Sequence, residues 1–148
     1  MKRIFLLFIV LSISACGGPR HTLNVNMVEG TVTLDGQPMA EVFVQFIPKT
    51  PGSGEVAGGY SDQTGKYRLT STNGSAGQGA MTGEYTVTVS KVEITETYPP
   101  GADTNEVSPT VTKKELFPDV YTDQTKSPIT KSVSAGKNVI DIEVSSKP

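Results

Sequence analysis

The chain has 148 residues, with 13 basic and 15 acidic side chains and a formal net charge of −2. No run of Lys or Arg is long enough to neutralise a series of phosphates, so we expect no nucleic-acid partner. The single cysteine, Cys16, excludes an internal disulfide, and the single histidine, His21, excludes a metal site built on several histidines.

The first residues have the form of an export signal. Lys2 and Arg3 precede an apolar run of about ten residues, which leads into the small residues Ser14 and Ala15. At 1.5 Å per residue, such a run is too short to cross a hydrocarbon core of about 30 Å. We therefore predict a signal peptide at 1–15 and exclude it from the fold.

The end of this signal, Ile13-Ser14-Ala15-Cys16, resembles the lipobox of bacterial lipoproteins. The resemblance implies that the Cys16 thiol receives a diacylglycerol and that the signal is cut just before it. It also implies acylation, such as palmitate, of the new amino terminus, and two or more acyl chains make a stable membrane anchor. Gly17 stands where some lipoproteins carry an inner-membrane retention aspartate, which favours the outer membrane. The alternative is an ordinary signal peptide beside a free cysteine.

Removal of 1–15 leaves 133 residues, the size of one domain, and a net charge of −4 because two basic residues leave with the signal. Thr, Ser, Gly, Val and Pro are plentiful and tryptophan is absent, which indicates a β-rich fold. Residues 16–26 contain two glycines and a proline and predict a flexible tether behind the lipidated cysteine. Residues 27–148 are the predicted folded domain.

Seven short strands are expected in chain order within this domain. They cover 28–34, 41–47, 56–61, 66–71, 85–92, 129–133 and 139–144. Asp35-Gly36 predicts a hairpin turn, Asp62 and Gly65 close a second turn, and the last two strands are expected to pair across 134–138. This pattern predicts an all-β, antiparallel Greek-key β-sandwich.

The alternation along these strands predicts which side chains form the core. The expected inward-facing residues are Val42, Val44, Phe46, Tyr67, Leu69, Tyr85, Val87, Val89, Ile140, Ile142 and Val144.

Three sequence blocks resemble the carboxypeptidase regulatory-like domain. Val28–Met39 is similar to its G-x-V-x-x-D-G-x-P-L opening, Ser61–Tyr67 to its T-D-x-x-G-x-Y/F hairpin, and Gly83–Val89 to its G-x-Y-x-V-x-V strand. The blocks occur in the family's order, and small lipoproteins of planctomycete-like bacteria are the nearest match. The resemblance implies a seven-stranded transthyretin-like (prealbumin-like) sandwich and says little about function.

Nothing in the sequence assembles a catalytic site. His21 lies in the tether, and a nucleophile–histidine arrangement needs a packed imidazole. Asp62 is interpreted as a turn cap rather than a calcium ligand. The candidate acid–base pairs are interpreted as solvated surface carboxylates: Glu93 with Glu96, Asp119 with Asp123, and Asp141 with Glu143. We predict no enzyme activity, no metal and no cofactor.

The regular pattern is lost over 93–119, which prolines interrupt, so we predict a long loop there. Tyr98, Phe117 and Tyr121 flank it. They are candidates for a carbohydrate- or peptide-binding edge, although an apolar cluster beneath the loop is favoured.

These observations lead us to expect a lipid-anchored cell-envelope protein with a non-enzymatic structural, adhesion or accessory role. Its expected partners are the membrane, through the lipid on Cys16, and an envelope protein or glycan. The alternative function is a carbohydrate- or peptide-binding module that uses the 93–119 loop. A hydrolase based on carboxylates is a third hypothesis.

Overall fold

The computed structural model describes residues 24–72, 77–101 and 106–147. The predicted signal peptide at 1–15, Cys16, His21 and most of the predicted tether lie outside this part. The regular secondary structure of the described chain is nearly all strand, with a single-turn helix α1 (Asp119–Thr122), which confirms the all-β class. Within the described residues, no helix has the length and apolar character needed to cross a membrane.

The first five-stranded sheet is antiparallel throughout. Its strand order is β12 (Thr130–Val133), β9 (Gly83–Ser90), β4 (Phe43–Pro48), β5 (Ala57–Tyr60) and β7 (Thr70–Ser71). The central pair, β4 and β9, runs through six residue pairs. Its inward side chains, among them Val44, Phe46, Val87 and Val89, are fully buried, as the alternation predicts.

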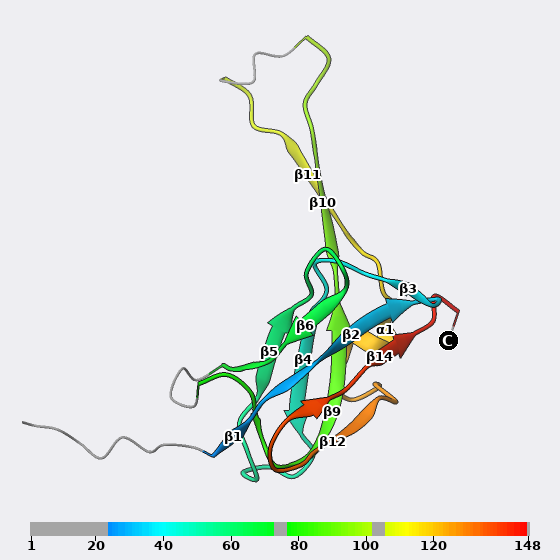
Figure 1. The fold of residues 1–148 in the computed structure, drawn as a ribbon. Coiled ribbons are helices and arrows are strands. Elements are labelled where there is room, and N and C mark those ends of the chain that lie inside the picture. The colour runs from blue at the N-terminus through cyan, green and yellow to red at the C-terminus, as the bar shows by residue number, and fades with distance from the viewer. Residues whose placement is uncertain (1–23, 73–76, 102–105, 148) are drawn as a thin grey trace, which may run out of the picture.

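The second sheet is built around β2 (Val28–Leu34), which crosses the body of the molecule in Figure 1. Antiparallel partners of β2 are β3 (Gln37–Pro38) and β6 (Lys66–Arg68). Its parallel partners are β13 (Asn138–Val139) and β14 (Ile142–Val144), so the expectation of a purely antiparallel fold is wrong here. A separate two-strand pair joins β1 (Val25–Asn26) to β8 (Ala80–Met81), which places the last residues of the predicted tether in the fold.

One buried apolar cluster joins the inner faces of the two sheets. Phe46 lies at its centre, with its ring centroid 6.4 Å from that of Tyr67 and 5.8 Å from that of Tyr85. Both phenols find backbone acceptors: Tyr67 donates to the Ile140 carbonyl at 2.6 Å and Tyr85 to the Met81 carbonyl at 2.8 Å. Burial raises the pKa of both tyrosines, so they remain neutral donors.

A close backbone approach at Gly30 connects β2 to the C-terminal strands. The Ile140 N–H donates to the Glu29 carbonyl at 2.8 Å, and the Thr31 N–H donates to Oδ1 of Asp141 at 2.8 Å. The Asp141 carboxylate thus takes the place of a backbone carbonyl as the acceptor for β2, at the point where the chain passes from β13 to β14. A Cβ on Gly30 would lie 1.9 Å from the Ile140 oxygen, so only glycine fits between these two bonds.

The last two predicted strands do not pair with each other. β12 adds to β9 in the first sheet, while β13 and β14 add to β2 in the second. The turn between them is held by Asn138, whose Oδ1 accepts from the Ser134 N–H and whose Nδ2 donates to the Ser134 carbonyl. This turn carries the chain from one sheet to the other instead of closing a hairpin.

The predicted strand 66–71 is also divided between the sheets. Its first part, β6, pairs with β2, and its last part, β7, pairs with β5. Leu69, between the two parts, is fully buried. The predicted turn at Asp35-Gly36 is confirmed, with φ of 49° and 80°, but it joins β2 to the short β3 rather than to β4.

We expect Gly30→Ala to lower the free energy of unfolding by about 2–3 kcal/mol or more, because the new methyl group displaces the Ile140 carbonyl. Urea denaturation monitored by circular dichroism measures this loss. Gly52→Ala is the matched control. Gly52 has φ +79°, and no atom lies within 4 Å of a Cβ added there, so its alanine variant loses only about 1–2 kcal/mol, which is what an L residue costs in the left-handed conformation. Equal losses in the two variants would contradict the packing argument.

Candidate functional site

The predicted loop at 93–119 is largely a two-stranded ribbon, and the loop prediction is wrong for this part. β10 (Val92–Thr97) and β11 (Thr110–Glu115) pair antiparallel through six residue pairs. The two segments, VEITET and TVTKKE, are rich in Val, Ile and Thr, which favour strands. Both faces of the ribbon are exposed, so the alternation that identifies a half-buried strand is weak.

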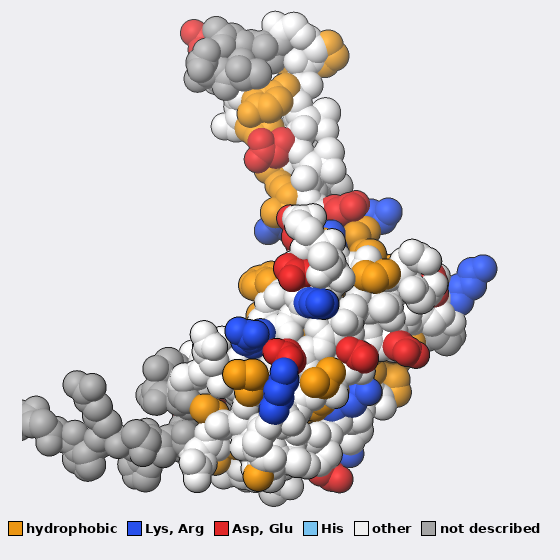
Figure 2. All heavy atoms as spheres, viewed as in Figure 1, with side chains coloured by type: hydrophobic (Ala, Val, Ile, Leu, Met, Phe, Trp, Pro, Cys, Tyr) orange, Lys and Arg blue, Asp and Glu red, His pale blue; other side chains and the backbone are white. Residues whose placement is uncertain are grey.

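The β10–β11 ribbon projects from the body of the molecule, as Figure 1 shows. It forms a separate two-stranded sheet, and within the described residues no third strand pairs with either edge. The register places Val92, Ile94 and Val111 on one face, where they are 49%, 61% and 49% exposed. Apolar side chains along the arm stand uncovered on the face seen in Figure 2.

A hydrogen-bonded clamp holds the base of the ribbon. Oε1 of Glu115 accepts from the backbone N–H groups of Lys91, Leu116 and Phe117 at 2.9, 3.1 and 3.2 Å. The Leu116 N–H also donates to the Lys91 carbonyl at 3.0 Å. Nζ of Lys91 donates to the Ala40 carbonyl at 2.9 Å, which ties the clamp to the body. The ribbon therefore leaves the body in a defined direction.

Charge is divided between the two strands of the ribbon. β10 carries Glu93 and Glu96 and no basic residue, whereas β11 carries Lys113 and Lys114 before the clamped Glu115. The register sets Glu93 opposite Lys114, so the two strands are electrostatically complementary along their shared ladder. The outer edge of β10 is left acidic and the outer edge of β11 basic.

The three predicted ligand-binding aromatics are not brought together. Tyr98, just after β10, is 37% exposed. Phe117 and Tyr121 are 3% and 9% exposed and belong to the main apolar cluster, where they cannot present a ring face to a ligand. Phe117 and Tyr121 are therefore apolar cluster residues, which is the favoured interpretation, and the three rings do not form one exposed edge.

The candidate carboxylates have structural partners. Oδ1 of Asp62 accepts from the N–H and hydroxyl of Thr64 and from the Lys66 N–H, which is a turn cap as expected. Thr64 is the main reason that the pKa of Asp62 is lowered. Asp123 makes the same bonds to Thr125. Within the described ranges, no group of three or more potential metal ligands gathers.

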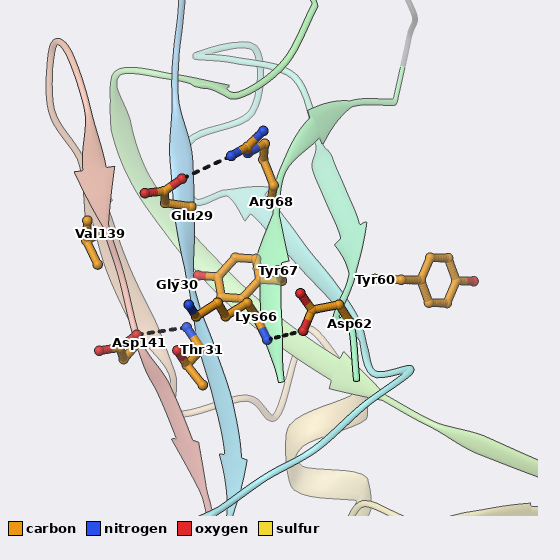
Figure 3. A pocket seen from close by; sticks show the side chains of 10 residues that line it. All are labelled: Glu29, Gly30, Thr31, Tyr60, Asp62, Lys66, Tyr67, Arg68, Val139 and Asp141. Atoms are coloured by element: carbon orange, nitrogen blue, oxygen red, sulfur yellow. Dashed lines mark hydrogen bonds and ion pairs between the residues drawn. The ribbon is translucent and has the colours of Figure 1, made fainter. Parts of the chain in front are cut away.

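A second candidate is an open groove of about 700 Å³ on the outer face of the sheet around β2. Glu29 lies between Lys137, 2.7 Å away, and Arg68, 3.3 Å away, and these ion pairs lower its pKa, with the Lys137 hydrogen bond as the largest cause. Figure 3 shows Glu29 turned toward Arg68, and Tyr60 pointing away from the other lining residues. The charges of the groove are largely compensated by one another.

No protein-family model matches the sequence, and no curated protein matches it significantly. Among solved structures, the chain aligns with a 9R-lipoxygenase from Cyanothece PCC8801, at 11% identity and a TM-score of 0.36. The alignment covers 92% of this chain and 18% of the lipoxygenase chain. A TM-score of this size supports no inference about fold or activity.

We expect the stabilising effect of Glu29 to depend on pH. Its pKa in the folded state lies below the usual 4.5, so its ion pairs stabilise the fold above about pH 4.5 and are lost as pH falls through the lowered value. Glu29→Gln should therefore reduce the free energy of unfolding at neutral pH, and the difference from the parent should shrink on acidification.

Urea titrations between about pH 7 and pH 3 measure this difference. Glu143→Gln, at an exposed glutamate of the same sheet, is the matched control. A Glu29→Gln deficit that stays constant over the whole range would contradict the ion-pair explanation.

We expect Glu115→Ala to loosen the base of the ribbon, because three backbone N–H groups lose their shared acceptor. An unsatisfied donor costs about 1–3 kcal/mol, so the amides of Lys91 and Phe117 should exchange with solvent about tenfold faster or more, whereas the Leu116 amide keeps the Lys91 carbonyl as its acceptor. Hydrogen exchange followed by NMR measures this, with Glu96→Ala as the control on the ribbon itself. Unchanged exchange at these amides would show that the clamp does not set the ribbon's direction.

Proposed function

We propose that this protein is a lipid-anchored cell-envelope protein, of the transthyretin-like sandwich type, that presents the β10–β11 ribbon to a partner. In this proposal the role is non-enzymatic and serves adhesion, assembly or an accessory function at the outer membrane. The observation that carries it is the ribbon, an exposed pair of strands that is clamped at its base and that pairs with no other strand of the described chain.

The position of the ribbon supports this role. Cys16 precedes the first described residue, Asn24, by eight positions, a length of chain that spans at most about 29 Å. A lipid on Cys16 would therefore hold the β1 end of the body close to the bilayer. Figure 1 places the ribbon at the opposite end of the body from β1. The ribbon would then point away from the membrane, where a partner can reach it.

The charge and burial of the described residues support docking over chemistry. Of the candidate acid–base carboxylates, Asp123 holds a turn and Asp141 accepts from the Thr31 N–H. Between the two ligand classes of the alternative function, peptide is favoured over carbohydrate. Sugar recognition uses exposed aromatic faces, and Phe117 and Tyr121 are buried, whereas an unpaired strand edge is suited to an extended peptide.

We expect cells that express the full chain to incorporate labelled palmitate into it, and Cys16→Ala to abolish the label. Fractionation of the parent protein should place it with the outer membrane. Ser14→Ala, which keeps a small residue before the cysteine, is the matched control and should retain the label. An unlabelled parent protein released in soluble form would overturn the anchoring proposal.

A further inference from the structure

We infer that the outer edge of β10 binds an extended, basic segment of a partner protein as a third strand of the ribbon. The inferred partner segment carries two basic residues three positions apart, with an aliphatic residue between them. This inference deepens the proposed function by naming the chemistry of the partner.

The first support is the unpaired backbone of β10. Its neighbour on one side is β11, and within the described part of the chain no strand lies on the other side. A two-stranded hairpin on its own is marginally stable in water, and three strands are more stable than two. An added strand would satisfy the outward N–H and carbonyl groups of β10 by the same ladder that joins it to β11.

The second support is the kind of charge on the β10 edge. Natural edge strands are commonly blocked by charged side chains, above all lysine, by proline or by a bulge. β10 has no lysine, proline or bulge and is paired regularly along its whole length, and its charges are the carboxylates of Glu93 and Glu96, which oppose an acidic strand but not a basic one. β11, in contrast, carries Lys113 and Lys114. The two edges of the ribbon therefore differ, and β10 is the one open to a further strand.

The third support is charge. Glu93 and Glu96 are both exposed, and β10 has no cation to compensate them on its free side. On the paired side, β11 already places Lys114 opposite Glu93. An incoming strand that repeats this arrangement gains the same cross-strand pairs.

A second copy of β10 is a poor partner for the same edge, because it would line four carboxylates along one ladder. Charge thus favours a basic segment of another protein over self-association.

The spacing of the glutamates defines the pattern of the partner. Glu93 and Glu96 are three residues apart, so they project from opposite faces of the ribbon. A complementary strand needs basic residues at the same spacing, whether it runs parallel or antiparallel to β10. Ile94 lies between them in sequence, next to Val92 on a face that also carries Glu96 and Lys113, so an aliphatic residue opposite Ile94 adds apolar contact to a mixed face.

The test uses the full chain purified in detergent and three fluorescent peptides. The first peptide contains Lys-Thr-Ile-Lys flanked by Thr and Val, the second has Glu in place of both Lys, and the third is the first with alternate backbone amides N-methylated. Fluorescence anisotropy should show binding of the first peptide, and binding at least about tenfold weaker for the other two. The affinity for the first peptide should fall with added salt.

Glu93→Lys/Glu96→Lys should lose the first peptide and gain the second, while Glu93→Gln/Glu96→Gln should weaken the first without favouring the second. The matched control, Glu84→Lys/Glu143→Lys, makes the same charge change at exposed glutamates of the body and should bind as the parent does. Circular dichroism checks that every variant is folded.

Three results would overturn the inference: no binding of the first peptide at about millimolar concentration, equal binding of the N-methylated peptide, or equal effects of the ribbon and body substitutions. The assay in detergent is independent of where the protein is anchored. Failure of peptide binding with intact palmitate labelling would therefore count against the β10 edge alone, and loss of labelling with intact binding against the anchoring alone.

Discussion

The fold depends on the close approach of the C-terminal strands to β2 at Gly30. Two hydrogen bonds join the chain's last segment to one of its first: the Ile140 N–H donates to the Glu29 carbonyl, and the Thr31 N–H donates to the side-chain carboxylate of Asp141. The Tyr67 hydroxyl, from the core, donates to the carbonyl of Ile140. Because a side chain at residue 30 would occupy the position of that carbonyl, the absence of a Cβ is the condition for all three contacts.

This contact joins the C-terminal strands to β2 in the second sheet, whereas the ribbon begins from the first sheet. β9, which pairs with the central strand β4, ends at Ser90, and β10 begins at Val92. The exposed ribbon is therefore almost a direct continuation of a buried strand. The ribbon has little apolar packing of its own, and its direction depends on the hydrogen bonds of Glu115 and Lys91. The buried core stabilises the body, and backbone hydrogen bonds orient the arm.

The charge pattern separates the two candidate sites. In the groove, Glu29 forms ion pairs with Lys137 and Arg68, and the Asp141 carboxylate accepts a hydrogen bond from the Thr31 N–H. These charged groups therefore stabilise the sheet around β2. On the ribbon, Glu93 has Lys114 opposite it on β11, whereas Glu96 is opposite Val111. A basic partner strand could pair with both glutamates along the free edge of β10, and for this reason the ribbon carries the functional proposal.

The sequence by itself determined the all-β class, the turns at Asp35-Gly36 and Asp62, and the inward faces of the long strands, because each of these follows from local turn chemistry or period-two alternation. It also placed Cys16 in a lipobox-like setting, outside the described residues. Which strands pair became evident only in the folded chain. The segments 129–133 and 139–144 resemble a hairpin in sequence, but they pair with β9 and β2, which are distant in sequence. Phe117 precedes the single-turn helix α1 and Tyr121 lies within it, and one turn is too short to show a helical period, so their burial could not be read from periodicity. The ribbon was not predicted because both of its faces are exposed, so β10 and β11 lack the alternation of buried and exposed residues that identifies a strand. Their pairing joins segments that are separated in sequence, and it is evident only in the folded chain.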